Sequence, residues 1–305
     1  MPEQIPDGAT GGTPTAPRLV TPAMLRQWPL PDPAGSKYDR GQAVVIGGAR
    51  STPGAVLLAG VSALRMGAGK LHLGVAETVA AHLAVAVPES GVTGLAESSS
   101  GSVSGIGAGA ALEAETSRAD AVLIGPGLDA PDGSARLLSE VVPTLPQDVP
   151  VVLDAFGLTI LPDVDQAVVD MLRGRVVATP NPGELARILD RDEIGDDELA
   201  EATLEAAEKY GAVVGCADWA VADGRVWKVT TGDTGLGTSG SGDVVAGALL
   251  GLLSRGAGVA QALVWAKYVH AAAGDTLAMR FGRVGYLAGE LPSELPLVLR
   301  TLRGD

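Results

Sequence analysis

The sequence has 305 residues, of which 46% are hydrophobic and 19% charged, and its formal net charge is −14. This composition can build a sizeable core, and the negative charge disfavours nucleic acid and anionic membranes as the main partners. The single cysteine, Cys216, excludes an intrachain disulfide and a cysteine-rich metal site. Because there is no apolar run of about 18 residues and no basic, apolar leader, we expect a cytoplasmic protein that does not enter a membrane.

The first residues differ in composition from the rest of the chain. Residues 1–20 are rich in proline, glycine and threonine and show no periodicity, which predicts a disordered or loosely attached tail. Thr21 and Pro22 then have the residue types of a helix N-cap and first helical position. We expect residues 21–305 to form a single α/β domain.

After a loop, apolar strand patterns alternate with helix-length segments, an order typical of a parallel sheet covered by helices on both faces. Strands are expected within 41–48, 69–76, 119–127 and 149–158, and helices within 52–68 and 196–211. Residues 174–189 read as strand, turn and helix, and 212–232 as a strand pair that turns at Asp223 and Gly224. Two long helices, within 243–256 and 259–280, close the predicted fold.

Four of these strand ends carry glycine or aspartate: "VIGGARSTPG" (45–54), "IGPGL" (124–128), "LDAFG" (153–157) and "TPNPGE" (179–184). Ligands of open α/β sheets bind beyond the carboxyl ends of the strands. We therefore expect these segments to meet in one crevice. Asp154 ends an apolar strand, and we place it at the polar rim because an unpaired buried carboxylate is costly.

"GSGD", from Gly240 to Asp243, opens a predicted helix after a flexible loop rich in glycine and threonine. A simple interpretation is an aspartate near a helix start, where the free N–H groups favour an anion. The alternative is a cradle of backbone N–H groups for a phosphate, beside which Asp243 acts as a general base.

Other polar residues allow two interpretations each. Pro182 and Glu184 are ordinary residues for a first helical turn, whereas Asn181 could contact a ligand and Glu184 could hold water on a metal ion. The three histidines (His72, His82 and His270) lie far apart in apolar segments, which favours structural or surface roles over metal binding.

Together, "GQAVVIGGARSTPGAVLLAGVSALRMGAGKLHLG", "VPES", "IGPGL", "VVLDAFGL", "TPNPGE" and "GSGDVVAGALLGLL" follow one another in an order that resembles the ADP-dependent (S)-NAD(P)H-hydrate dehydratases. This resemblance implies a ribokinase-like three-layer sandwich with a mainly parallel central sheet and helices on both faces. It also implies the repair of hydrated NADH or NADPH, with ADP or ATP as co-substrate and Mg²⁺. Relatives form homo-oligomers, so we expect one here.

The resemblance also implies roles for individual residues. Asp243 is the implied base, with Gly240, Ser241 and Gly242 at the nucleotide phosphates. The other implied contacts are Ala55, Gly127 and Asn181 to the hydrated dinucleotide, Glu184 to a metal ion through water, and Cys216 and Ala217 to the nucleotide. Three segments depart from the family: Asn181 stands where histidine is usual, Cys216 and Ala217 replace a lysine and glycine, and "SKY" at 36–38 replaces "HKG". Lys37 and Lys228 are candidates for restoring the missing positive charge.

Two other functions stay open. An ATP-dependent kinase of a small alcohol or sugar would use the Gly-Ser-Gly-Asp turn equally well. A nucleotide-binding protein that has lost turnover would fit the missing lysine and histidine, although it would not need Asp243.

Overall fold

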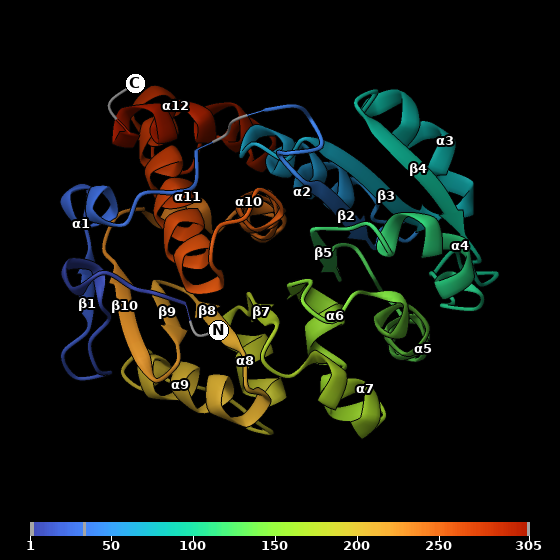
Figure 1. The fold of residues 1–305 in the computed structure, drawn as a ribbon, viewed down its shortest axis with the longest axis horizontal. Coiled ribbons are helices and arrows are strands. Elements are labelled where there is room, and N and C mark those ends of the chain that lie inside the picture. The colour runs from blue at the N-terminus through green and yellow to red at the C-terminus, as the bar shows by residue number, and fades with distance from the viewer. Residues whose placement is uncertain (1–2, 33–34, 304–305) are drawn as a thin grey trace.

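The computed structural model describes residues 3–32 and 35–303, whose strands form one ten-stranded sheet in the order β1-β10-β9-β8-β7-β6-β5-β2-β3-β4 (Figure 1). From β8 to β4 all neighbouring strands run parallel, whereas β9 is antiparallel to both β8 and β10, and β1 is parallel to β10. The strands are β1 (Arg18–Val20), β2 (Gln42–Ile46), β3 (Lys70–Ala76), β4 (Ser90–Leu95), β5 (Ala121–Ile124), β6 (Val151–Leu153), β7 (Val176–Ala178), β8 (Val213–Cys216), β9 (Trp219–Ala222) and β10 (Arg225–Val229).

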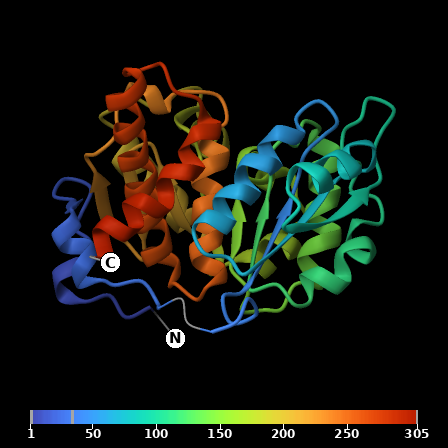
Figure 2. The same cartoon turned by 90° about the horizontal axis from the view of Figure 1, so that it is seen from above.

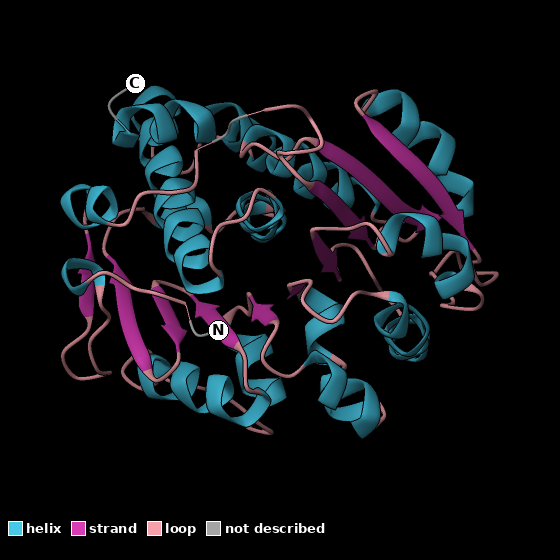
Figure 3. Cartoon of the chain, in the orientation of Figure 1, coloured by secondary structure: helices cyan, strands magenta, loops and turns pink. Residues whose placement is uncertain are grey.

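Helices lie on both sides of the sheet (Figure 3). One core holds side chains of α1, α2, α10, α11 and α12, and a second core on the other face holds those of α4 to α9. The helices are α1 (Pro22–Gln27), α2 (Pro53–Arg65), α3 (Glu77–Ala86), α4 (Ala108–Thr116), α5 (Pro131–Val141), α6 (Ala155–Thr159), α7 (Gln166–Leu172), α8 (Pro182–Ile188), α9 (Leu199–Tyr210), α10 (Ser241–Ser254), α11 (Val259–Phe281) and α12 (Leu291–Arg303). Short 3₁₀ turns span Asp7–Ala9, Val142–Thr144, Leu161–Asp163, Thr234–Leu236 and Ala288–Glu290. The three layers confirm the predicted fold class.

Strand side chains alternate between the two cores, as the period of a strand requires. In β2, Ala43 and Val45 belong to the core with α2 and α10, whereas Val44 and Ile46 belong to the other. Both faces of the sheet are therefore covered, which explains why these strands read as continuous apolar runs. Within 3–32 and 35–303, no helix is both long and apolar enough to cross a membrane.

The positions predicted from the sequence are confirmed for the central strands and for the helices α2, α8, α9, α10 and α11. Thr21 is the N-cap of α1, and its side chain accepts a hydrogen bond from the Met24 N–H. The prediction of a strand pair within 212–232 is corrected. This segment forms three strands, because a turn at Ala217 precedes the predicted turn at Asp223 and Gly224. Ala217 and Asp223 have positive φ values of 46° and 48°. Alanine rarely adopts such a conformation, so the sequence does not predict the turn at Ala217.

Residues 3–20 contact the body of the fold, whereas the sequence predicts a disordered or loosely attached tail over 1–20, of which residues 1–2 lie outside the described part of the chain. Strand β1 pairs with β10, and the carbonyl of Ala9 accepts a hydrogen bond of 2.9 Å from Nε1 of the buried Trp227. Glu3 accepts hydrogen bonds from the Ala260 and Gln261 N–H groups in the first turn of α11. Figures 1 and 2 show this blue segment beside the orange and red C-terminal helices. Composition alone missed it because its partners lie over 200 residues away.

Helices α2 and α10 approach each other closely through small residues. A β-carbon at Gly247 would collide with the carbonyl oxygen of Ala59, and one at Gly251 with that of Ala63. Both contacts advance by four residues in the same direction, so the two helices are in register and their N-termini lie at the same end. One turn earlier on each helix stand Asp243 and Ala55.

Candidate functional site

The four predicted strand ends are neighbours. Strands β7, β6, β5 and β2 are adjacent and parallel, so their carboxyl ends share one edge of the sheet. Their loops are linked directly, because the Gly48 N–H donates to the Pro126 carbonyl at 2.8 Å and Thr179 Oγ1 donates to Asp154 Oδ1 at 2.8 Å. The convergence predicted from the sequence is confirmed.

Ala55 and Gly127 are brought together at this edge. Gly127 has φ of 68°, and its carbonyl accepts a hydrogen bond from Thr52 Oγ1 at 2.7 Å. A β-carbon at Gly127 would lie 3.1 Å from that of Ala55. Glycine is needed here for its backbone conformation and for the close approach of the two loops.

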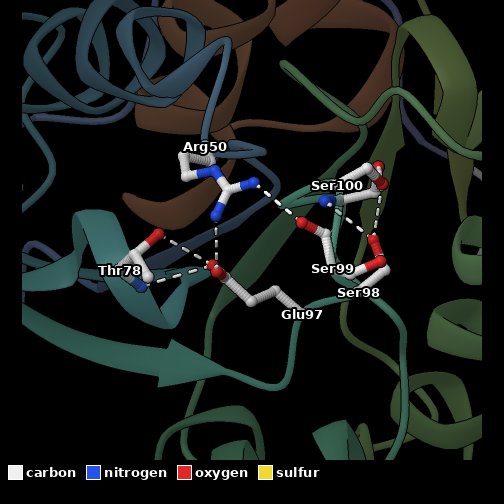
Figure 4. Close-up of polar contacts among 7 residues, drawn as sticks. Arg50, Thr78, Glu97, Ser98, Ser99 and Ser100 are labelled. Carbon is white, nitrogen blue, oxygen red and sulfur yellow. Dashed lines mark hydrogen bonds and ion pairs between the residues drawn. The ribbon is translucent and has the colours of Figure 1, made fainter.

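The loop after β2 is fixed on its other side by Arg50 (Figure 4). Nη2 of Arg50 donates to the carbonyl of Ser99 at 3.0 Å, and Nη1 lies 3.6 Å from Oε1 of Glu97. Glu97 also accepts a hydrogen bond of 2.9 Å from Thr78 Oγ1. Arg50 therefore ties neighbouring loops together, and its charge is balanced by Glu97.

The first turn of α10 provides free backbone donors. Gly240 is the N-cap with φ of 89°, a conformation that favours glycine. The Ser241 N–H is taken by the Thr238 carbonyl at 3.2 Å, whereas the N–H groups of Gly242 and Asp243 have no acceptor within the helix. With the positive end of the helix dipole, they form a site for an anion.

Asp243 is the third residue of α10 and is partly buried. Burial, with a smaller contribution from the charge of Glu184, raises its pKa to about 6. Asp154 is buried, and burial together with Glu184 raises its pKa to about 7, with a further contribution from Asp243. Three carboxyl groups, from the starts of α6, α8 and α10, thus repel one another at the strand ends.

Asn181 and Glu184 form a capping box at the start of α8. Asn181 Oδ1 accepts from the Glu184 N–H at 2.9 Å, and Glu184 Oε2 accepts from the Asn181 N–H at 2.9 Å. The segment "TPNPGE" therefore starts a helix, in line with the helix-start interpretation and with the preference for asparagine as N-cap. The exposed Asn181 amide keeps its NH₂ group for a ligand.

A cavity of about 510 Å³ opens beside this edge, between β8, α10 and α11. It brings together Asn181, Ala217, Ser241 and Gly242 of the predicted site. Its other lining residues are Thr179, Pro180, Pro182, Gly215, Asp218, Val229, Thr231, Gly232, Leu236, Gly237, Val245, Lys267, His270 and Ala271. Ala55, Gly127, Glu184, Gly240 and Asp243 are not part of its wall, so the predicted site extends beyond this cavity.

Cys216 does not contribute its side chain to the cavity, and its implied contact with the nucleotide stays a prediction. Strand alternation places Cys216 in the opposite core, fully buried, and this burial raises the pKa of its thiol to about 12. Gly215 and Ala217 are the cavity-facing residues of this segment.

His270 and Lys267 are site residues that the sequence interpretation missed. Nε2 of His270 lies 3.0 Å from Ser241 Oγ, which links α11 to the first turn of α10. Burial, with the nearby charge of Lys267, lowers the pKa of His270 to about 4, so the ring is neutral near pH 7. The sequence contains a signal for this pair, because Lys267 and His270 are three residues apart and therefore share one face of a helix.

The carboxyl groups fit a metal ion held through water. Carboxylate oxygens are the protein ligands that Mg²⁺ prefers, and Mg²⁺ keeps several waters. Asp154, Glu184 and Asp243 are close enough to raise the pKa of a neighbour. No group of three or more histidine, cysteine, aspartate or glutamate side chains in 3–32 and 35–303 has the spacing of a direct metal site.

This fold, with a helix N-terminus and a carboxylate at the strand ends, defines the ribokinase-like class. A ribokinase-like superfamily protein from Enterococcus faecalis is similar in fold, with a TM-score of 0.78, 21% identity and coverage of 94% of this chain and 97% of that one. The profile of the NAD(P)H-hydrate dehydratases matches residues 43–297. The chain belongs to the NAD(P)H-hydrate dehydratase family.

Individual relatives support this membership. An ADP-dependent (S)-NAD(P)H-hydrate dehydratase of Xanthomonas campestris is 41% identical, over 93% of this chain and 97% of that protein. A bifunctional NAD(P)H-hydrate repair enzyme of Moorella thermoacetica is 36% identical over 94% of this chain, which spans 55% of that longer protein. The crystal structure of an ADP/ATP-dependent NAD(P)H-hydrate dehydratase from Bacillus subtilis, co-crystallized with ATP and Mg²⁺, has a TM-score of 0.77 and 28% identity over 93% of this chain and 98% of that one.

Proposed function

We propose that this protein is an ADP-dependent (S)-NAD(P)H-hydrate dehydratase that restores NADH or NADPH from their hydrated forms. The observation that carries the proposal is Asp243, a carboxylate with a pKa near 6 beside the free N–H groups at the start of α10. A base needs a pKa close to the working pH to accept a proton efficiently. The identity with the Xanthomonas campestris dehydratase over nearly both whole chains supports the same substrate class.

In this proposal Asp243 accepts the proton of the hydroxyl group on the hydrated pyridine ring. The hydroxyl oxygen bonds to the terminal phosphorus of ADP, and the phosphoanhydride bond breaks to release AMP. The ring nitrogen lone pair then expels phosphate as the carbon–oxygen bond breaks, and loss of a proton from the adjacent ring carbon restores the reduced nicotinamide. The N–H groups of Gly242 and Asp243 stabilise charge on the phosphoryl oxygens.

The other predicted residues position the two substrates. Gly127 and Ala55, which pack closely at the strand ends, contact the dinucleotide in this proposal, and the Asn181 NH₂ group donates to it. Glu184 and Asp154 would hold Mg²⁺ through water, and the bound ion would neutralise charge on the phosphoryl oxygens.

One assay distinguishes this function from its alternatives. Hydrated NADH is incubated with the protein, Mg²⁺ and either ADP or ATP, and the absorbance of the reduced ring and the nucleotide products are followed. The proposal predicts recovery of the absorbance with one AMP and one phosphate released per ring when ADP is supplied. Phosphorylation of a small alcohol or sugar without ring recovery would indicate a kinase, and nucleotide binding without either product would indicate a protein without turnover.

A further inference from the structure

Lys267 lies on α11 and contributes to the wall of the cavity beside the start of α10. Its Nζ donates a hydrogen bond of 2.6 Å to the Ala217 carbonyl at the end of β8. A lysine ammonium has three N–H donors, so two remain for a ligand. Among the described residues that line this cavity, Lys267 is the only lysine or arginine.

The lysine reaches the strand end because β8 carries glycine at position 215. A β-carbon at Gly215 would lie 3.2 Å from Cδ of Lys267 and 2.7 Å from Cδ1 of Leu263. A larger residue at 215 would therefore clash with Leu263 and crowd the Lys267 side chain. Gly215 on β8 and Lys267 on α11 therefore fit together, because the glycine leaves space for the lysine stem.

The surroundings leave the charge of Lys267 available. The nearby Asp218 carboxylate is paired with Lys228 at 3.3 Å, and Lys228 also lies over the Trp219 ring at 4.3 Å. His270, one turn along α11, is neutral near pH 7. Burial lowers the pKa of Lys267, and an anion in the cavity would favour its charged form.

The two lysines considered from the sequence are less suited to this role. The Lys228 ammonium is engaged by Asp218 and Trp219. Lys37 lies beside Gly69, just before β3 begins, so it stands at the amino ends of the strands, opposite the crevice. Neither contributes to the cavity wall.

We propose that Lys267 binds the phosphoryl oxygens of the adenine nucleotide, together with the free N–H groups at the start of α10. The ammonium supplies the positive charge that the strand segment of Cys216 and Ala217 lacks. The inference rests on the proposed function, because it assigns the cavity to the nucleotide that the reaction consumes.

Isothermal titration of ADP, ATP and adenosine tests this role. The proteins compared are the unmodified chain, Lys267→Gln, Lys267→Arg and the matched control Lys37→Gln, whose exposed lysine stands at the opposite end of the strands. Loss of a charge-assisted hydrogen bond predicts that Lys267→Gln binds ADP and ATP about 10- to 100-fold more weakly while binding adenosine unchanged. Lys267→Arg should recover part of the loss, and Lys37→Gln should bind all three ligands like the unmodified chain.

Equal ADP affinity in Lys267→Gln and the unmodified chain would overturn the proposal, as would a parallel loss of adenosine binding, which indicates a packing role. An unmodified chain that binds neither ADP nor ATP would overturn it as well. The repair activity is measured separately: nucleotide binding that depends on Lys267 without recovery of the reduced ring would contradict the proposed function alone.

Discussion

Gly247 of α10 packs directly on Ala59 of α2, where a β-carbon on the glycine would lie 2.6 Å from the alanine Cα. This contact sets the register of the two helices whose first turns carry Asp243 and Ala55. A single added methyl group should therefore strain the fold and move the first turn of α10.

Gly247→Ala should lower the free energy of unfolding by about 1 to 3 kcal/mol, the usual cost of overpacking a filled core. The matched control is Gly54→Ala in the partner helix α2, where nothing lies within 4 Å of the added β-carbon. Urea denaturation of both variants checks the prediction, and equal stability of the two would contradict the close packing of α2 and α10.

The pH dependence of turnover follows from the carboxyl groups around Asp243. Because Asp243 must be ionised to accept a proton and its pKa is raised to about 6, kcat/KM should fall as the pH drops below about 6. Glu184→Gln removes a negative charge that raises this pKa, so the acid limb should move to lower pH. Glutamine preserves the capping box with Asn181. A pH profile of kcat/KM whose acid limb stays in place in the variant would argue against this coupling.

Asp154 should make stability depend on pH in the opposite sense to a salt-bridged carboxylate. Its folded pKa of about 7 exceeds that of an unfolded aspartate, about 3.9, so the folded protein holds the proton more tightly. Its contribution to stability is therefore fully present below about pH 4 and is lost as the pH rises to about 7.

Asp154→Asn should remove this pH-dependent loss of stability. On going from pH 4 to pH 8, the free energy of unfolding of the variant should therefore change more favourably than that of the unmodified chain, by on the order of 2 to 4 kcal/mol. Denaturation at the two pH values measures the difference. The exposed Asp192→Asn is the control and should leave the difference unchanged. An Asp154→Asn variant with the same pH dependence as the unmodified chain would show that this carboxyl group titrates normally.

Much of the fold and part of the candidate site could be predicted from local patterns. Apolar runs ending in glycine or aspartate marked the strand ends, and Gly240 and Asn181 stood where helices begin. These features depend on neighbours within a few residues, which is the distance over which backbone propensity and capping act.

What the sequence did not predict depends on distant contacts. Lys267 was not singled out from the sequence, because only its position across Gly215 and Ala217 brings it to the strand end. The burial of the Cys216 side chain in the opposite core depends on the register of β8, which the local sequence does not set. The order of residues 3–20 likewise depends on Trp227 in β10.

The central claim is that Asp243 activates a hydroxyl group in this crevice, and Asp243→Asn tests it most directly. Recovery of reduced-ring absorbance from hydrated NADH and ADP is measured beside ADP affinity, with the exposed Glu201→Gln of α9 as a charge-matched control. We predict that Asp243→Asn loses turnover by about 10²- to 10⁴-fold while ADP affinity stays close to that of the unmodified chain. An Asp243→Asn variant with undiminished turnover would contradict the account.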